Sequence, residues 1–120
     1  MSAEPIDVEE LLKRTMNNAR IAAKVLKAFE SDVATTSDRI MQGIQELRRE
    51  EVVRLSHGLK GAAANIGAAS LRVLAGELEE MARDRELVDS LKIANELRQE
   101  VDRCLEQCPR LFARLNGTKN

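Results

Sequence analysis

Aromatic residues are almost missing from this chain of 120 residues: they make up 2% of it, and Trp and Tyr are absent. Proteins that bind single-stranded nucleic acid stack bases on aromatic rings, and Phe29 and Phe112 are too few for such a platform. An excess of one charge is missing as well, because 19 Lys and Arg face 20 Asp and Glu, for a net charge of −1. We therefore expect no nucleic-acid partner, since such proteins usually carry a strongly basic surface.

Long hydrophobic runs are also missing, since charged residues interrupt every apolar stretch well short of the roughly 20 residues that cross a bilayer. The first ten residues, MSAEPIDVEE, have neither the basic nor the apolar region of a secretory signal. Two cysteines, Cys104 and Cys108, are too few to stabilise a secreted mini-domain by disulfide bonds. At this helical spacing we expect both to be free thiols. These features predict a cytoplasmic protein with no membrane segment.

Proline occurs only near the two ends, at Pro5 and Pro109. The sequence between them is rich in the helix formers Ala, Leu, Glu, Arg and Lys. No stretch of alternating β-branched residues is long enough to predict a strand. The length suits one domain over residues 1–120, and the predicted fold class is all-α.

Apolar periodicity and cap signals predict five helices. We expect them over about residues 7–15, 18–46, 50–65, from Ser70 to a charged turn at 83–86, and from 87 to 108 or beyond. Asp7 and Glu10 form a capping arrangement for the first helix, and Gly67 is suited to end the third in a left-handed conformation. Four long amphipathic helices predict a monomeric, antiparallel four-helix bundle over about 7–115, with a short additional N-terminal helix and a frayed tail at 116–120.

The core-facing sides of the second and third helices follow from the same periodicity. In the second helix, a stripe recurs at three- and four-residue steps through Ile21, Val25, Ala28/Phe29, Asp32/Val33, Thr36 and Ile40, and Ile44 and Leu47 continue it. In the third helix, a rotation of 100° per residue gathers one apolar arc: Val52, Leu55, Leu59, Ala62, Ala63 and Ile66. The other side of this helix presents Val53, Arg54, His57, Lys60, Gly61 and Ala64, so His57 is expected to point away from the core.

The surroundings of His57, the only histidine in the chain, are unusual. Lys60 and Gly61 follow it by three and four residues, within side-chain reach on a helix. Gly58 and Gly61 each cost a helix roughly 1 kcal/mol relative to Ala, which suggests that another surface must come close to His57. An exposed imidazole is a good nucleophile at neutral pH, and the ammonium of Lys60 would neutralise charge on a phosphoryl group.

Nucleotide-binding and metal-binding motifs are absent from the sequence. It has no GxxxxGK[ST] loop, no kinase glycine-rich loop and no carboxylate-rich metal cluster. We therefore expect a protein that holds a phosphoryl group but does not take it from ATP. Such a protein has no intrinsic cofactor or metal and is not an enzyme in the usual sense.

The run from Ser56 to Ala68, SHGLKGAAANIGA, resembles the signature of the histidine-containing phosphotransfer (HPt) domains of bacterial phosphorelays. That signature is a His, then Leu-Lys-Gly two to four positions on, then a Gly ten positions after the His. The residues that match it are His57, Leu59, Lys60, Gly61 and Gly67. The similarity covers most of residues 6–105. Outside the signature it includes Asp7, Leu11, Arg14, Phe29, Leu71, Leu74, Leu78 and Glu79.

The resemblance implies a four-helix bundle whose exposed His shuttles phosphoryl groups to and from the aspartates of receiver domains. In these terms His57 is the phosphoacceptor, Lys60 assists the phosphoryl group, and Gly61 leaves room for the partner. The implied partners are response-regulator receiver domains and a hybrid sensor histidine kinase, with Mg²⁺ held by the receiver. On this chain we expect the partner to meet Val53, Arg54, Gly58, Gly61 and Ala64.

Glu79 aligns with a polar position, often Gln, that lies beside the His in members of this family. The resemblance thus implies a carboxylate that orients His57, whereas without it Glu79 would be interpreted as a plain surface residue. Two positions depart from the family pattern. Gly58 replaces the commoner Thr or Ser, and Arg48-Arg49 occupies a turn that often contains Gly-Asp.

Two other functions compete with phosphotransfer. The dimerisation helices of a sensor kinase typically carry Glu directly after the His and need an ATP-binding domain; here Gly58 follows and no such domain is present. The alternative that stays open is a non-catalytic helical adaptor that binds a receiver domain without being phosphorylated. The two functions differ in whether a phosphorylated receiver labels His57.

Overall fold

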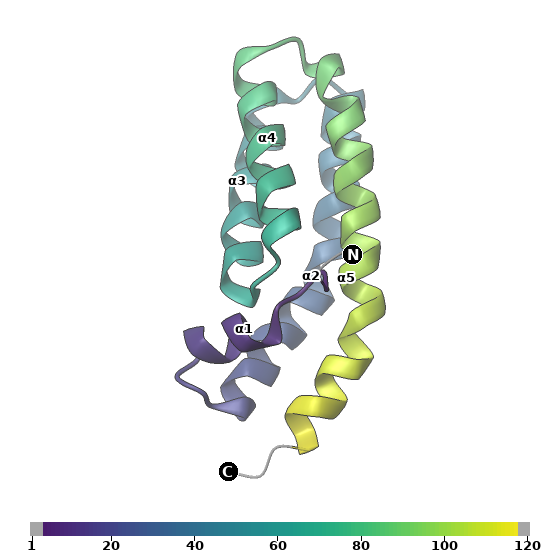
Figure 1. The fold of residues 1–120 in the computed structure, drawn as a ribbon. Helices are drawn as coiled ribbons and strands as arrows, with labels where there is room; N and C mark the ends of the chain where they lie inside the picture. Colours follow the sequence, from purple (N-terminus) through teal and green to yellow (C-terminus); the bar gives the residue numbers. More distant parts are fainter. Residues whose placement is uncertain (1–3, 118–120) are drawn as a thin grey trace.

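A computed structural model describes residues 4–117, and helices dominate it (Figure 1). Along this part of the chain lie α1 (Val8–Arg14), α2 (Ala19–Gln45), α3 (Arg49–Ile66), α4 (Ala69–Asp84), the short 3₁₀ helix η1 (Leu87–Ser90) and α5 (Leu91–Gly117). Residues 4–117 contain no strand, which confirms the all-α prediction. The bounds of α1 to α4 agree closely with those expected, while the last predicted helix begins as η1 and continues as α5.

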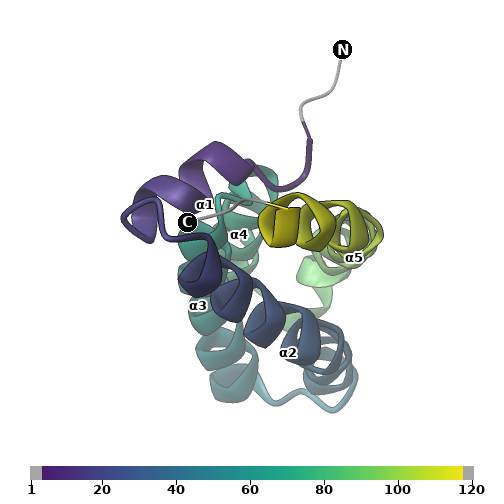
Figure 2. The same ribbon diagram turned by 90° about the horizontal axis from the view of Figure 1, so that it is seen from below.

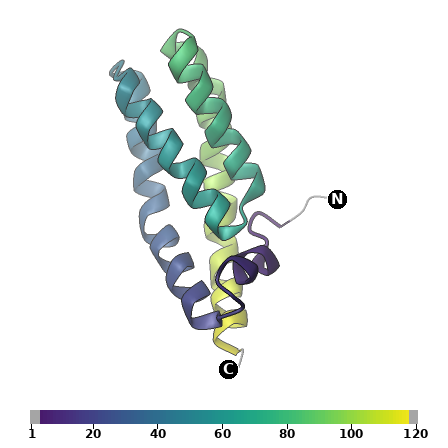
Figure 3. The same ribbon diagram turned by 90° about the vertical axis from the view of Figure 1, so that its left-hand side faces the viewer.

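The four long helices run alternately up and down and pack side by side (Figures 1 and 2). α3 packs on α2 and α4, and α5 packs on the same two helices from the other side. α2 and α5 extend past α3 and α4 at one end, where α1 lies against α2 and α3 (Figure 3). The predicted antiparallel bundle with a short additional N-terminal helix is therefore confirmed.

Apolar side chains that recur along each helix form the core. The large ones that are almost fully buried include Ile6, Leu11, Leu26, Ile40, Ile66, Leu71, Leu78 and Leu97. Burying such side chains is the main source of stability for a bundle of this size.

The predicted apolar stripe of α2 is correct in its middle and wrong at both ends. Phe29, Val33, Ile40 and Ile44 are buried as expected, and the remaining buried residues of the helix follow the same face. Ile21 is exposed because the neighbouring Ala22 takes the core-facing position in that turn. Leu47 is exposed because it lies beyond the end of α2, with a φ of 57° that breaks the helical periodicity.

Asp7 and Gly67 act at two helix ends as expected from the sequence, whereas the expected part of Glu10 in the first cap is absent, because the N–H of Asp7 donates to the carbonyl of Gly67. Oδ1 of Asp7 accepts hydrogen bonds from the backbone N–H groups of Glu9 and Glu10, at 3.0 and 3.2 Å, and so caps α1. Gly67 ends α3 with a φ of 74°, in the left-handed region.

The C-terminal end of the bundle is longer than predicted. Residues 116 and 117, expected in a frayed tail, belong to α5, and residues 118–120 lie outside the described part of the chain. Pro109 lies inside α5 on its exposed side. The helix continues beyond this proline because the buried side chains of Leu111 and Leu115 hold its last turns against the bundle.

The bundle also begins slightly earlier than predicted, because α5 holds the segment before α1. The side-chain amide of the buried Gln107 accepts a hydrogen bond from the N–H of Ile6 at 2.7 Å and donates one to the carbonyl of Ile6 at 2.9 Å. These bonds fix Ile6 in the core, where it is 1% exposed.

The structure also bears on the cysteines, on possible metal-binding groups and on possible membrane-spanning helices. Cys104 and Cys108 are buried free thiols as predicted, and burial raises their pKa values to about 12 and about 11. No group of three or more His, Cys, Asp or Glu side chains within residues 4–117 is placed to hold a metal ion. None of the helices in this range is both long and apolar enough to span a bilayer.

Candidate functional site

α3 places His57 on its solvent face near the middle of the helix. The predicted core face is buried, with Val52, Leu55, Leu59, Ala63 and Ile66 all below one-tenth exposed and Ala62 half-buried. The side chain of His57, on the other side of the helix, is 68% exposed. Because the buried face fixes the rotation of α3, the imidazole is held toward solvent, as the sequence predicts.

Gly58 and Gly61 leave the backbone of α3 bare beside His57. A Cβ at either position would meet no atom within 4 Å. Packing within the described chain therefore gives no reason for a glycine at either position. The sequence interpretation, in which the small residues clear an approach for another molecule, is consistent with this geometry.

We expect Gly58→Ala and Gly61→Ala each to stabilise the isolated protein by roughly 0.5–1 kcal/mol, because Ala is the better helix former and both sites have room for it. Urea unfolding followed by circular dichroism measures the change. Gly43→Ala is the contrasting variant, since its Cβ would lie 2.8 Å from Cγ2 of Val52 and should destabilise. Destabilisation by the Gly58 or Gly61 change would show that the fold itself needs that glycine.

Three hydrogen-bond donors from α3 and α4 converge on the carboxylate of Glu79. Nδ1 of His57 lies 3.1 Å from Oε2, Nζ of Lys60 lies 3.2 Å from Oε1, and the guanidinium of Arg83 lies 3.0 Å from Oε2. The side chain of Glu79 is only 6% exposed. Glu79 is therefore not a plain surface carboxylate, and it lies beside His57 where the family resemblance implied a polar side chain.

The protonation state of this cluster follows from its contacts. Burial acts to raise the pKa of the Glu79 carboxyl, but the hydrogen bonds from Lys60, Arg83 and His57 outweigh it and hold the pKa below its ordinary value. Glu79 is thus ionised at neutral pH and can only accept hydrogen bonds, so Nδ1 of His57 carries a proton. The neutral imidazole consequently has its lone pair on Nε2.

Lys60 reaches Glu79 by crossing over Gly76 of α4. Its Cδ lies 3.4 Å from the position that a Cβ would take at Gly76, which is ordinary contact. An alanine would fit there, whereas a larger side chain would push the Lys60 stem aside. Gly76 therefore leaves room for the stem of Lys60 and helps to place its ammonium.

Arg83 is the member of the cluster that sequence analysis missed. The charged run 83–86 predicts a solvated turn, but Arg83 belongs to the last turn of α4 and donates to Glu79. The signal that could have indicated this pair is the four-residue spacing between Glu79 and Arg83, which brings opposite charges together on one helix face.

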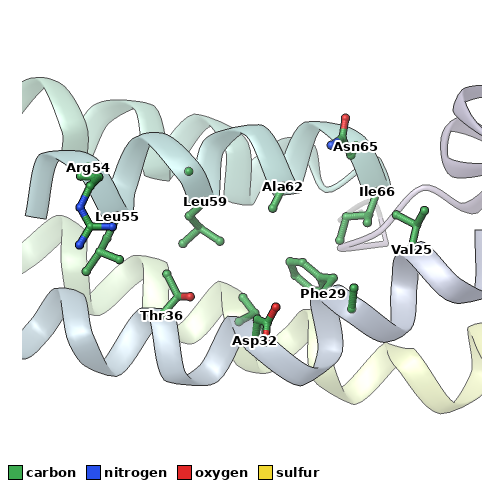
Figure 4. A pocket seen from close by; sticks show the side chains of 13 residues that line it. Val25, Phe29, Asp32, Thr36, Arg54, Leu55, Leu59, Ala62, Asn65 and Ile66 are labelled. Atoms are coloured by element: carbon green, nitrogen blue, oxygen red, sulfur yellow. The ribbon is translucent and has the colours of Figure 1, made fainter. Parts of the chain in front are cut away.

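A groove of about 450 Å³ opens between α2 and α3 and reaches Gly58, next to His57 (Figure 4). Its lining is mainly apolar and includes Val25, Phe29, Val33, Leu55, Leu59, Ala62 and Ile66. Arg54 of α3 and Asp32 of α2 add one charge of each sign. Val25, Phe29 and Val33 of the predicted apolar stripe thus line this groove; Val25 is half-buried there, whereas Phe29 and Val33 are buried.

The residues predicted to meet a partner surround His57 on α3 but differ in exposure. Arg54, Gly58 and Gly61 are exposed, whereas Val53 and Ala64 are half-buried. Val53 and Arg54 also border a second depression, whose other lining residues are Arg49, Glu50 and Arg83. The surface next to His57 therefore combines bare backbone with basic side chains.

Comparison with known proteins agrees with this arrangement. The Hpt domain family model matches residues 24–107, a range that includes α3, α4 and the whole Glu79 cluster. A solved structure with the same fold is the HPT domain from the Hpt sensor hybrid histidine kinase from Shewanella. It has a TM-score of 0.84 and 17% identity, and the alignment covers 92% of this chain and 96% of that chain. No curated protein matches the chain. The family match spans most of the sequence and confirms the resemblance: the chain belongs to the Hpt domain family.

Proposed function

We propose that this domain relays phosphoryl groups between aspartates of receiver domains through a phosphohistidine on His57. Membership of the Hpt family makes the chain a phosphotransfer module of two-component signalling. The observation that carries the finer proposal is the state of His57. Its ring is 68% exposed, and its Nδ1 is engaged by an ionised carboxylate, which leaves the lone pair on Nε2 for attack.

In this proposal the chain supplies the nucleophile and a local positive charge. Nε2 of His57 attacks the phosphorus of an aspartyl phosphate, the N–P bond forms, and the receiver carboxylate leaves with the electron pair of the broken P–O bond. Lys60, one turn along α3, supplies an ammonium that can attract the phosphoryl oxygens. The Mg²⁺ for this reaction belongs to the receiver, so the module is a phosphocarrier and not an enzyme.

We place the docked receiver over the exposed side of α3, with apolar side chains in the groove between α2 and α3. The groove is mainly apolar and reaches Gly58, so a partner seated in it would lie beside Nε2 of His57. Arg54 would meet an acidic group of the partner. A hybrid sensor histidine kinase is a suitable upstream partner, since the Shewanella domain of the same fold comes from one.

Incubation with a receiver phosphorylated on its aspartate tests the relay. The wild-type chain should acquire label that is labile in acid and stable in base, as a phosphohistidine is, and a second receiver should remove it. His57→Gln should acquire no label, while its circular dichroism and urea midpoint show that the bundle still forms. Label on His57→Gln, or none on the wild type, would overturn the proposal. Receiver binding without labelling would instead favour the helical adaptor.

A further inference from the structure

The turn between α1 and α2 carries two exposed apolar side chains. Met16, in the turn, is 83% exposed and has a left-handed backbone with a φ of 55°, and Ile21, at the start of α2, is 47% exposed. Glycine and asparagine adopt this backbone conformation at lower cost than methionine does. The fold therefore gives no reason for an apolar side chain at the tip of this turn.

Positive charge surrounds the same turn. Residues 11–29 contain five Lys and Arg and no Asp or Glu, although the whole chain has a net charge of −1. Lys13, Arg20 and Lys24 are exposed, and within residues 4–117 none of them forms an ion pair. The other two cations pair with neighbouring glutamates. One end of the bundle thus combines exposed apolar side chains with uncompensated positive charge.

Helix stability does not explain the cation at Arg20. This residue lies in the first turn of α2, which contains no acidic side chain, and the free N–H groups there already carry partial positive charge. Arg20 and Lys24 are one turn apart and share a face of α2. Neither of them lines the groove between α2 and α3 that reaches Gly58. A partner could therefore meet this face without covering that groove.

We propose that this basic corner, formed by Lys13, Met16, Arg20, Ile21 and Lys24, docks on an anionic lipid surface. Met16 and Ile21 enter the headgroup layer, and the cations meet the phosphates and carboxylates of the lipids. The turn projects from one corner of the bundle (Figures 1 and 2), so a flat layer can take in its apolar side chains while the flexible cations around it stay at the surface. This shape favours a membrane over an acidic protein.

The other end of α2 offers a matched contrast. Leu47 follows α2 as Met16 precedes it, is 74% exposed and also has a left-handed backbone, with a φ of 57°. Its surroundings differ in charge, because residues 46–51 contain three Glu and two Arg. Leu47 therefore has the exposure and the backbone of Met16 without an excess of positive charge.

Tryptophan fluorescence tests the proposal, because the chain contains no Trp and each substitution introduces a single one. Met16→Trp and Leu47→Trp are compared with vesicles of phosphatidylcholine, with and without phosphatidylserine. We expect the emission of Met16→Trp to shift to the blue only with phosphatidylserine, and the shift to diminish at high salt. The emission of Leu47→Trp should not shift with either vesicle.

Cosedimentation with the phosphatidylserine vesicles then separates the charge from the apolar contact. Arg20→Gln/Lys24→Gln should weaken binding about tenfold or more. The control Arg85→Gln/Lys92→Gln removes the same charge from two other exposed cations and should bind as the wild type does. Met16→Ser/Ile21→Ser should also weaken binding with all cations in place. Circular dichroism shows that each variant is folded.

Three outcomes would overturn the proposal. One is a wild-type chain that does not bind phosphatidylserine vesicles, and another is an equal blue shift for the two tryptophans. The third is binding that needs the cations but not Met16 and Ile21, which would indicate an ionic site for an acidic macromolecule in place of a lipid surface. None of these outcomes depends on phosphorylation of His57, so the relay and the lipid surface stand or fall separately.

Discussion

Replacing Gly61 by leucine is expected to slow phosphoryl transfer from a phosphorylated receiver at least about tenfold, equivalent to about 1.4 kcal/mol. Labelling by phosphoramidate should stay unchanged. In the free protein no atom lies within 4 Å of the Cβ position at Gly61, so the leucine can extend into solvent without disturbing α3. A receiver that brings its aspartyl phosphate to Nε2 must cover this space, because Gly61 lies one turn from His57 on the same helix face. Phosphoramidate is a small donor and can reach Nε2 without covering this space.

Gly117→Leu is the matched control for this prediction. Gly117 also faces open space, and it is the last residue of α5, whose C-terminal end lies away from α3 (Figure 1). Initial rates of transfer from the same receiver, compared for the two variants and the wild type, show whether obstruction is local to His57. A wild-type rate for Gly61→Leu would mean that the receiver does not cover Gly61. Slower labelling by phosphoramidate as well would point to a distorted α3 and contradict the steric explanation.

The orientation of His57 could be predicted from the sequence because it depends on one helix. Once Leu55, Leu59 and Ile66 are assigned to the core, the geometry of the α-helix determines where His57 points. The contacts of Glu79 could not be predicted in the same way. They depend on how α4 is rotated and shifted relative to α3, and the packing of whole helix faces determines both. Only the family resemblance indicated that Glu79 lies near His57, and it gave no indication of Arg83.

The helix ends show the same difference between local and tertiary causes. Asp7 and Gly67 were predictable caps because a short polar side chain and a glycine act on the adjacent backbone. The extension of α5 through residue 117 was not predictable from local signals, since Pro109 and Gly117 both favour an earlier end. Burial of Leu111 and Leu115 against the rest of the bundle outweighs those signals.

Gly67→Ala is expected to destabilise the protein by roughly 2–5 kcal/mol, which combines the cost of a left-handed alanine with that of steric overlap. With φ at 74°, a Cβ at this position would lie 2.6 Å from the carbonyl oxygen of Asp7 and 3.0 Å from Cβ of Glu10. Asp7 has little freedom to retreat. Its N–H donates to the carbonyl of Gly67 at 2.9 Å, and its side chain caps α1. Urea unfolding monitored by circular dichroism measures the loss.

Gly61→Ala, the same change only six positions earlier, is the control and is expected to have the opposite sign. Gly67 is required by the contact between α1 and the end of α3, whereas nothing within the described chain requires Gly61. A loss below about 1 kcal/mol for Gly67→Ala, smaller than a left-handed alanine alone should cost, would contradict this contact. The Gly67→Ala protein that remains folded should still be labelled by phosphoramidate at the wild-type rate, because Glu79, Lys60 and Arg83 keep their contacts between α3 and α4. Loss of stability without loss of labelling would show that the fold needs Gly67, whereas the site around His57 does not.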